Sequence, residues 1–216
     1  MLPQRGEKCK KRISAMKKTP GHNLEPHYRM LTREHLEART RHPVHIVLEN
    51  IRSAFNVGSI FRTSDAGAVE HIHLCGYTCH PPNLKLAKTA LGAFDYVPWT
   101  HHEEPADAVK HLRGMGIPVV AIETADNARS VGTYIWPQPV AIVFGNEVKG
   151  ISPELLSECD EIVRIPMLGY KNTINVATAF GIVLYDILGQ WGALREPAAS
   201  AGPKNQKPAP CPDEGQ

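Results

Sequence analysis

Three short blocks of small and polar residues constrain the fold most strongly, because each lies between an apolar, strand-like run and a run with helical spacing. They are residues 56–62 (NVGSIFR), 144–150 (FGNEVKG) and 165–175 (IPMLGYKNTIN). In open α/β sheets such joints lie at the carboxyl ends of the strands, where ligands bind. Three joints of this kind in one small domain predict a single composite pocket and favour an enzyme.

The regions between and around these blocks alternate between strand and helix patterns. Strands are expected at 44–48, 71–74, near 96–99, and at 117–122, 140–144 and 161–165, and helices at 56–67, 104–115, 153–158 and 175–193. This alternation predicts an α/β fold with a mostly parallel sheet covered by helices on both faces. The last helix is apolar nearly all the way round, so part of it is expected at a subunit interface.

Charge and composition divide the 216-residue chain into three parts. Residues 1–42 hold eleven Lys or Arg against four Glu, a net charge of +7, so the remainder carries −5 of the overall +2. This basic arm, with a short helix over 28–41, fits either a polyanionic partner such as RNA or a solvated extension. Residues 43–194 form the predicted domain, and the proline-rich segment 195–216 is expected to be a disordered tail.

Cysteine usage and hydropathy set the expected environment. The five cysteines are scattered and odd in number, which favours reduced thiols in a cytoplasmic protein. No apolar run approaches the ~20 residues that span a bilayer, and no secretory h-region follows the basic N-terminus. We therefore expect no membrane contact.

The first block places an arginine near the start of a helix. Asn56 suits the N-cap, and Val57, Ile60 and Phe61 follow the spacing of a buried stripe. Arg62 can clamp a phosphate with its two-pronged guanidinium, or it can form a surface pair with Asp65. Spacing alone leaves both interpretations open.

The sequence disfavours two common kinds of nucleotide site. Gly145 and Gly150 nearly fit the phosphate-binding loop G-x-x-x-x-G-K-[ST], but Ile151 occupies the position of the lysine. The G-x-G-x-x-G pattern of dinucleotide enzymes is absent as well. Glu147 is then a ligand contact or an ordinary loop carboxylate, and Asn175 is a ligand contact or a plain helix cap.

A zinc cluster is also excluded by strand geometry. His71, His73 and Cys75 alternate along a predicted strand, with Cys79 and His80 after them. Alternate strand residues lie about 6.6 Å apart, whereas zinc ligands must converge within about 2.0–2.3 Å of one ion. We expect no metal.

Taken together and in order, the blocks resemble the three motifs of the SpoU (TrmH-like) family of RNA ribose methyltransferases in the SPOUT class. The resemblance covers roughly residues 44–190. It implies an α/β fold with a deep C-terminal trefoil knot, a homodimer packed partly through the last helix, and S-adenosylmethionine (AdoMet) as methyl donor to a ribose 2′-hydroxyl in tRNA or rRNA. RNA binding without turnover and base methylation are the alternatives.

The same resemblance assigns roles to residues. It implies catalytic functions for Arg62, Asn56, Glu147 and Asn175, and a cofactor pocket formed by Glu123, Thr124, Gly145, Ile165, Met167, Thr173 and Ile174. Arg62 would be the base that takes the hydroxyl proton, or a phosphate clamp beside another acceptor. Neutralising an arginine at pH 7 costs about 7–9 kcal/mol, so both roles stay open.

Overall fold

The protein is built on a seven-stranded sheet in which every pairing is parallel. A computed structural model describes residues 40–194, and the strand order is β3-β2-β1-β6-β4-β7-β5. The strands are β1 (His42–Glu49), β2 (Val69–Cys75), β3 (Trp99–His102), β4 (Val119–Ile122), β5 (Arg129–Ser130), β6 (Val140–Phe144) and β7 (Glu161–Arg164). Since all strands run the same way, their carboxyl ends meet at one edge of the sheet.

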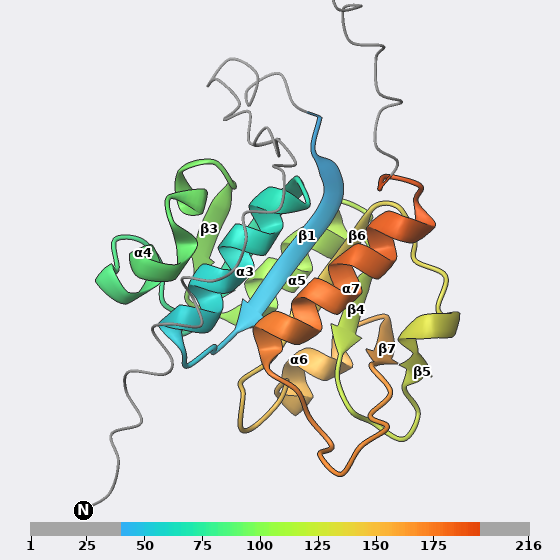
Figure 1. Cartoon of the computed structure of the whole chain (residues 1–216). Coiled ribbons are helices and arrows are strands. Elements are labelled where there is room, and N and C mark those ends of the chain that lie inside the picture. Colours follow the sequence, from blue (N-terminus) through green and yellow to red (C-terminus); the bar gives the residue numbers. More distant parts are fainter. Residues whose placement is uncertain (1–39, 195–216) are drawn as a thin grey trace, which may run out of the picture. The chain divides into compact units, whose positions relative to one another are not determined.

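Helices cover both faces of this sheet, as the alternating sequence predicts. They are α3 (Ala54–Ala66), α4 (Leu84–Ala90), α5 (Pro105–Gly114), α6 (Pro153–Ser157) and α7 (Val176–Gln190), with short 3-10 turns η1 (Ala93–Asp95) and η2 (Val131–Thr133). Residues of α3, α4 and α7 share one apolar core, and α5 and α6 contribute to a second. Figure 1 shows α5 on the far side of the sheet from α7.

Alternate residues of the central strands supply the two cores. Ile46 and Leu48 of β1 belong to the core beneath α3 and α7, whereas Val47 belongs to the core beneath α5. Every residue of β6 is buried. Burial on both faces is typical of parallel strands and explains why β6 reads as an uninterrupted apolar run.

The structure corrects several local predictions. Helix α3 begins two residues earlier than expected, and its N-cap is Ser53, whose side chain accepts from the Asn56 N–H, so Asn56 is not the cap. Strand β3 lies later than the predicted strand near 96–99, and the two-residue strand β5 was not predicted. Gly58 is buried where α3 meets α4, whereas Arg62 is exposed.

Two predicted segments lie outside the described residues 40–194. They are the basic arm with its short helix, apart from the arm's last three residues, and the proline-rich tail. Within the described range, no helix has the length and hydropathy needed to cross a membrane. The same residues contain no group of three or more potential ligands that could hold a metal ion.

Five imidazoles from four elements nevertheless gather beside the second core. His45, His71, His73, His102 and His111 form a chain of ring contacts, with the His71 and His73 centroids 4.7 Å apart. His73 Nδ1 and His102 Nε2 share a hydrogen bond of 3.1 Å, while His73 Nε2 is buried without a hydrogen-bond partner among residues 40–194. Burial, followed by repulsion from the other imidazoles, lowers the pKa of His73 to about 3.

This cluster predicts a loss of stability on acidification. The unfolded chain binds a proton at His73 near pH 6.5, and the folded chain does not until about pH 3, so the free energy of unfolding falls as the pH drops below 6.5. The contribution of His73 alone is about 1.4 kcal/mol at pH 5.5. Urea unfolding between pH 7.5 and 5 measures it. His73→Phe should flatten this pH dependence, whereas exposed His80→Phe should not. An equal slope in wild type and His73→Phe would contradict the prediction.

Candidate active site

A cavity of about 690 Å³ lies at the carboxyl edge of the sheet, where the adjacent strands β6, β4 and β7 end. Three chain segments line it: 122–124 after β4, 144–151 after β6, and a C-terminal segment running from Ile165 after β7 into the start of α7. The second and third segments contain two of the three blocks singled out in the sequence.

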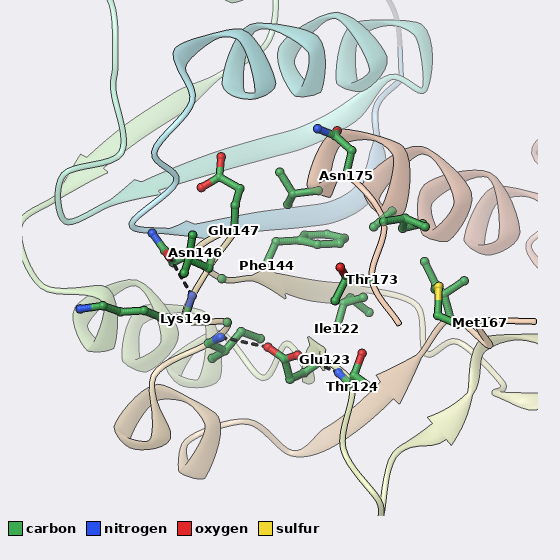
Figure 2. A pocket seen from close by; sticks show the side chains of 18 residues that line it. Ile122, Glu123, Thr124, Phe144, Asn146, Glu147, Lys149, Met167, Thr173 and Asn175 are labelled. Carbon is green, nitrogen blue, oxygen red and sulfur yellow. Dashed lines mark hydrogen bonds between the residues drawn. The ribbon is translucent and has the colours of Figure 1, made fainter. Parts of the chain in front are cut away.

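The cavity gathers nearly all the residues proposed for the cofactor and for catalysis. All seven expected cofactor residues line it: Glu123, Thr124, Gly145, Ile165, Met167, Thr173 and Ile174. Glu147 and Asn175 line it too. Figure 2 shows these two on one side, Glu123 and Thr124 on the opposite side, and Ile122, Phe144 and Thr173 between them.

Glu147 binds the start of helix α3 to the loop after β6. Its carboxylate accepts hydrogen bonds from the backbone N–H groups of Arg52 (2.8 Å) and Ser53 (3.1 Å) and from the Asn56 side-chain amide (2.9 Å). Burial alone would raise the pKa of Glu147, but these hydrogen bonds and one from its own backbone N–H outweigh burial and lower it. Glu147 is therefore an anion at neutral pH and a weak base.

Asn56 and Asn175 extend this contact to the third segment. The Asn175 amide donates to Asn56 Oδ1 at 3.0 Å, so both ends of the Asn56 side chain are fixed. The other end of Asn175 accepts from the N–H groups of Ala177 and Thr178, which makes it the N-cap of α7. Asn175 thus caps a helix and also joins the site. The hydrogen-bonded chain Glu147–Asn56–Asn175 connects all three sequence blocks.

Two glycines allow the loop after β6 to fold back on itself. A Cβ on Gly145 would overlap the backbone of Gly150 and Ile151. Gly150 has φ +73, and a Cβ there would lie 2.5 Å from Glu123 Oε2. The lack of a side chain at these two positions therefore accommodates close contacts within the protein.

Glu123 fixes the opposite wall through backbone hydrogen bonds. Its carboxylate accepts from the N–H groups of Thr124 (2.8 Å) and Ile151 (3.0 Å), both drawn in Figure 2. Each carboxylate oxygen has a further lone pair, so Glu123 can still accept a hydrogen bond from a ligand hydroxyl. Glu123 thus holds this wall of the cavity in place and can still accept a hydrogen bond.

Arg62 is the one proposed catalytic residue outside the hydrogen-bonded chain Glu147–Asn56–Asn175. It is exposed on α3 and, like Asn56, does not line the cavity. Arg62 follows Asn56 by six residues, about 1.7 helical turns, which turns it away from the side of α3 that faces Glu147. Within one chain, therefore, the structure brings Asn56, Glu147 and Asn175 together but not Arg62.

Two supporting residues, Glu49 and Asn146, are not indicated by the sequence. Buried Glu49 accepts from the backbone N–H and the hydroxyl of Ser152, which links the end of β1 to the N-cap of α6. Asn146 donates to the Asn50 carbonyl and accepts from the N–H groups of Val148 and Lys149. These partners are far apart in the sequence or lie within one tight loop, and no local pattern indicates them.

Comparison with known proteins identifies the family. The model of the SpoU rRNA Methylase family matches residues 43–185, most of the described chain. The chain belongs to the SpoU family. A SpoU relative, the tRNA (guanosine(18)-2′-O)-methyltransferase of Escherichia coli (strain K12), is 31% identical over 69% of this chain and 64% of its own length. The chain therefore spans slightly less than two thirds of that relative.

Other relatives support the same assignment. The tRNA (guanosine(18)-2′-O)-methyltransferase of Thermus thermophilus is 31% identical over 68% of this chain and 76% of its own. An AdoMet-bound rRNA methyltransferase from Sinorhizobium meliloti superposes with a TM-score of 0.64 at 30% identity, covering 71% of this chain and 59% of the other. The predicted SpoU resemblance is confirmed.

The packing of the β6 loop generates a stability prediction. Gly145→Ala should lower the free energy of unfolding by about 1–3 kcal/mol, because the new methyl group meets backbone atoms that cannot move independently. Thermal and urea unfolding measure the change. Gly114→Ala at the end of α5 is the matched control, since a Cβ there meets no atom within 4 Å. Equal stability of the two variants would contradict the account of this loop.

Proposed function

We propose that this SpoU protein transfers the methyl group of AdoMet to a ribose 2′-hydroxyl of tRNA or rRNA. The observation that carries the proposal is the single cavity whose walls contain the motif residues of the second and third blocks, tied by hydrogen bonds to Asn56 of the first. Relatives that bear the names of ribose methyltransferases support it.

The cavity fits AdoMet in size and chemistry. Its volume is within the range of about 300–1,000 Å³ typical of small-ligand sites. Ile165, Met167 and Ile174 offer an apolar surface suited to the adenine ring, and Thr173 adds a hydroxyl. Glu123 and Thr124 would offer polar groups to the polar parts of AdoMet, and the turn at Gly145 would lie against it. AdoMet supplies an electrophilic methyl group, so the reaction needs neither a metal nor a covalent nucleophile.

The protein's own contribution is to orient the RNA hydroxyl and to receive its proton. Glu147, anionic and fixed by three donors, holds Asn56 in place, and Asn56 holds Asn175. In this proposal Glu147 positions the site rather than accepting the proton, because its lowered pKa makes it a weak base. Aligning the reacting atoms accounts for much of the rate enhancement.

In this proposal, Arg62 of one subunit contributes to the active site of the other subunit. We infer a homodimer that uses α7, whose Ile182 and Tyr185 remain 42% and 45% exposed in the single chain. Helix α3 contacts α7, so a dimer through α7 would place Arg62 near the interface. There the guanidinium would act on the partner's bound RNA, as base or as phosphate clamp.

We also propose that the C-terminal part of the domain forms a trefoil knot. Strand β7 is inserted between β4 and β5, both of which precede it, as a threaded chain requires. Trp136 donates to Asp186 at 2.6 Å, which ties the segment before β6 to α7. These features support a trefoil knot in residues 119–190.

Cys75, Cys79 and Cys159 are free thiols, which supports a cytoplasmic location.

Methyl transfer tests the proposed function. The protein is incubated with methyl-labelled AdoMet and with separated tRNA and rRNA fractions, and label that survives alkaline hydrolysis as a 2′-O-methylated dinucleotide is counted. We expect label in one fraction and a loss of about 10²–10⁴-fold in kcat for Arg62→Ala with unchanged AdoMet affinity.

Mixed subunits and product analysis complete this test. When Arg62→Ala and Asn175→Ala subunits are mixed, half of the dimers contain one subunit of each kind, and each of these dimers has one intact composite site out of two. The mixture should therefore recover about a quarter of wild-type activity. Full activity of Arg62→Ala at saturating RNA would reject both roles of the arginine. Label on a base would indicate base methylation, and AdoMet binding without transfer to any RNA would favour the binding-only alternative.

A further inference from the structure

Tyr77 is an exposed aromatic residue whose position is fixed by hydrogen bonds at both ends. It follows β2 at the carboxyl edge of the sheet, and 62% of its surface is exposed. Its hydroxyl accepts from the Asn146 amide at 2.8 Å, and its backbone N–H donates to Asn50 Oδ1 at 3.1 Å. An exposed tyrosine ordinarily samples several rotamers. This one is held while a large part of its surface remains open to solvent.

The backbone on both sides of Tyr77 is anchored as well. The Gly76 N–H donates to the carbonyl of His102 at 2.9 Å. The buried Thr78 hydroxyl donates to the Leu48 carbonyl and accepts from the Ile51 N–H, both at 2.9 Å. The three-residue segment 76–78 is thus a fixed base for the Tyr77 ring.

Two uncommon backbone conformations support this arrangement. Asn50 has φ 54 and Gly76 has φ 60, and a Cβ on Gly76 would overlap the Asn50 Oδ1 that binds Tyr77. The left-handed conformation is unfavourable for residues other than glycine, although Asn tolerates it best. Conformations of this kind persist where the surroundings over-determine them and gather at functional sites.

Tyr77 lies next to the proposed reaction site and next to positive charge. Its partner Asn146 lines the cavity and also fixes the backbone of Lys149. The side chains of Lys149 and Arg52 are exposed, and Figure 2 shows Lys149 extending away from the other labelled residues of the cavity. Aromatic surfaces that stack on bases beside cations that contact phosphates are characteristic of single-stranded nucleic-acid sites.

We propose that the Tyr77 ring stacks on a base of the RNA substrate next to the cavity and so helps to position the nucleotide to be methylated. This role rests on the proposed function and adds a positioning residue to it. Arg52 and Lys149 contact the flanking phosphates. Because every base offers a π face, the stacking contributes affinity and placement with little sequence preference.

Three variants test the role of the ring. Tyr77→Ala removes the ring, and Tyr77→Phe keeps the ring but removes the hydroxyl bound by Asn146. Tyr96→Ala is the matched control, because Tyr96 is 48% exposed but precedes β3, at the opposite edge of the sheet. For each full-length protein, AdoMet affinity is measured by calorimetry, and the Kd for end-labelled unfractionated tRNA and fragmented rRNA by filter binding.

The proposal predicts a separation between the two affinities. Tyr77→Ala should weaken RNA binding about 5- to 150-fold, with AdoMet affinity and melting temperature unchanged, whereas Tyr77→Phe and Tyr96→Ala should bind RNA like wild type. RNA binding and methyl transfer by Tyr77→Ala at wild-type levels would overturn the proposal and leave the proposed function intact.

Two further outcomes would also overturn it. If Tyr77→Phe and Tyr77→Ala both lost AdoMet affinity, Tyr77 would only support the Asn146 loop. If Tyr77→Ala changed the oligomeric state, the ring would belong to a contact between subunits. Failure of the proposed function itself would appear separately, in the wild-type protein, as AdoMet binding without methyl transfer to either RNA.

Discussion

The carboxylate of Glu147 holds together parts of the chain that would otherwise meet only loosely. It satisfies two backbone N–H groups at the start of α3 and fixes Asn56, which in turn binds Asn175 at the start of α7. One anion thus determines how the ends of β1, β6 and β7 face one another. Its weak basicity follows from the same hydrogen bonds, which suits Glu147 to positioning its neighbours rather than to accepting a proton.

The parallel sheet makes this arrangement possible. Strand β6, which is buried throughout, carries only apolar side chains, so the polar residues that this strand brings to the site lie in the loop after it. Those loops converge because β6, β4 and β7 are neighbours in the sheet. The cavity is therefore a consequence of strand order, and its chemistry depends on which loop residues each strand delivers there.

The local sequence predicted those elements whose apolar pattern is strong and ends at clear boundary residues. Strand β6 was predicted to the residue, because an apolar run lies between Pro139 and Gly145. Strand β3 was misplaced, since its sequence Trp-Thr-His-His lacks an alternating apolar pattern, and two-residue β5 carries no signal. Ser53 was missed as a cap because Ala54 and Phe55 do not mark a helix start.

Contiguous motifs predicted which residues line the cavity, but not the long-range contacts that those residues make. Glu147 and Asn175 each had two interpretations, and only the fold showed that Glu147 binds α3 and that Asn175 both caps α7 and binds Asn56. The links from Tyr77 to Asn50 and Asn146 join residues 27 and 69 positions apart, which no spacing rule can relate. Arg62 fits the family motif, yet its exposed position could be read only from the structure.

If the segments after β4, β6 and β7 form one AdoMet site, hydrogen–deuterium exchange of the full chain with and without AdoMet will reveal it. We expect saturating AdoMet to slow exchange together in 122–124, 145–151 and 165–176, and to leave α4 unchanged. Protection confined to any other part of the chain, or none at saturation, would contradict it.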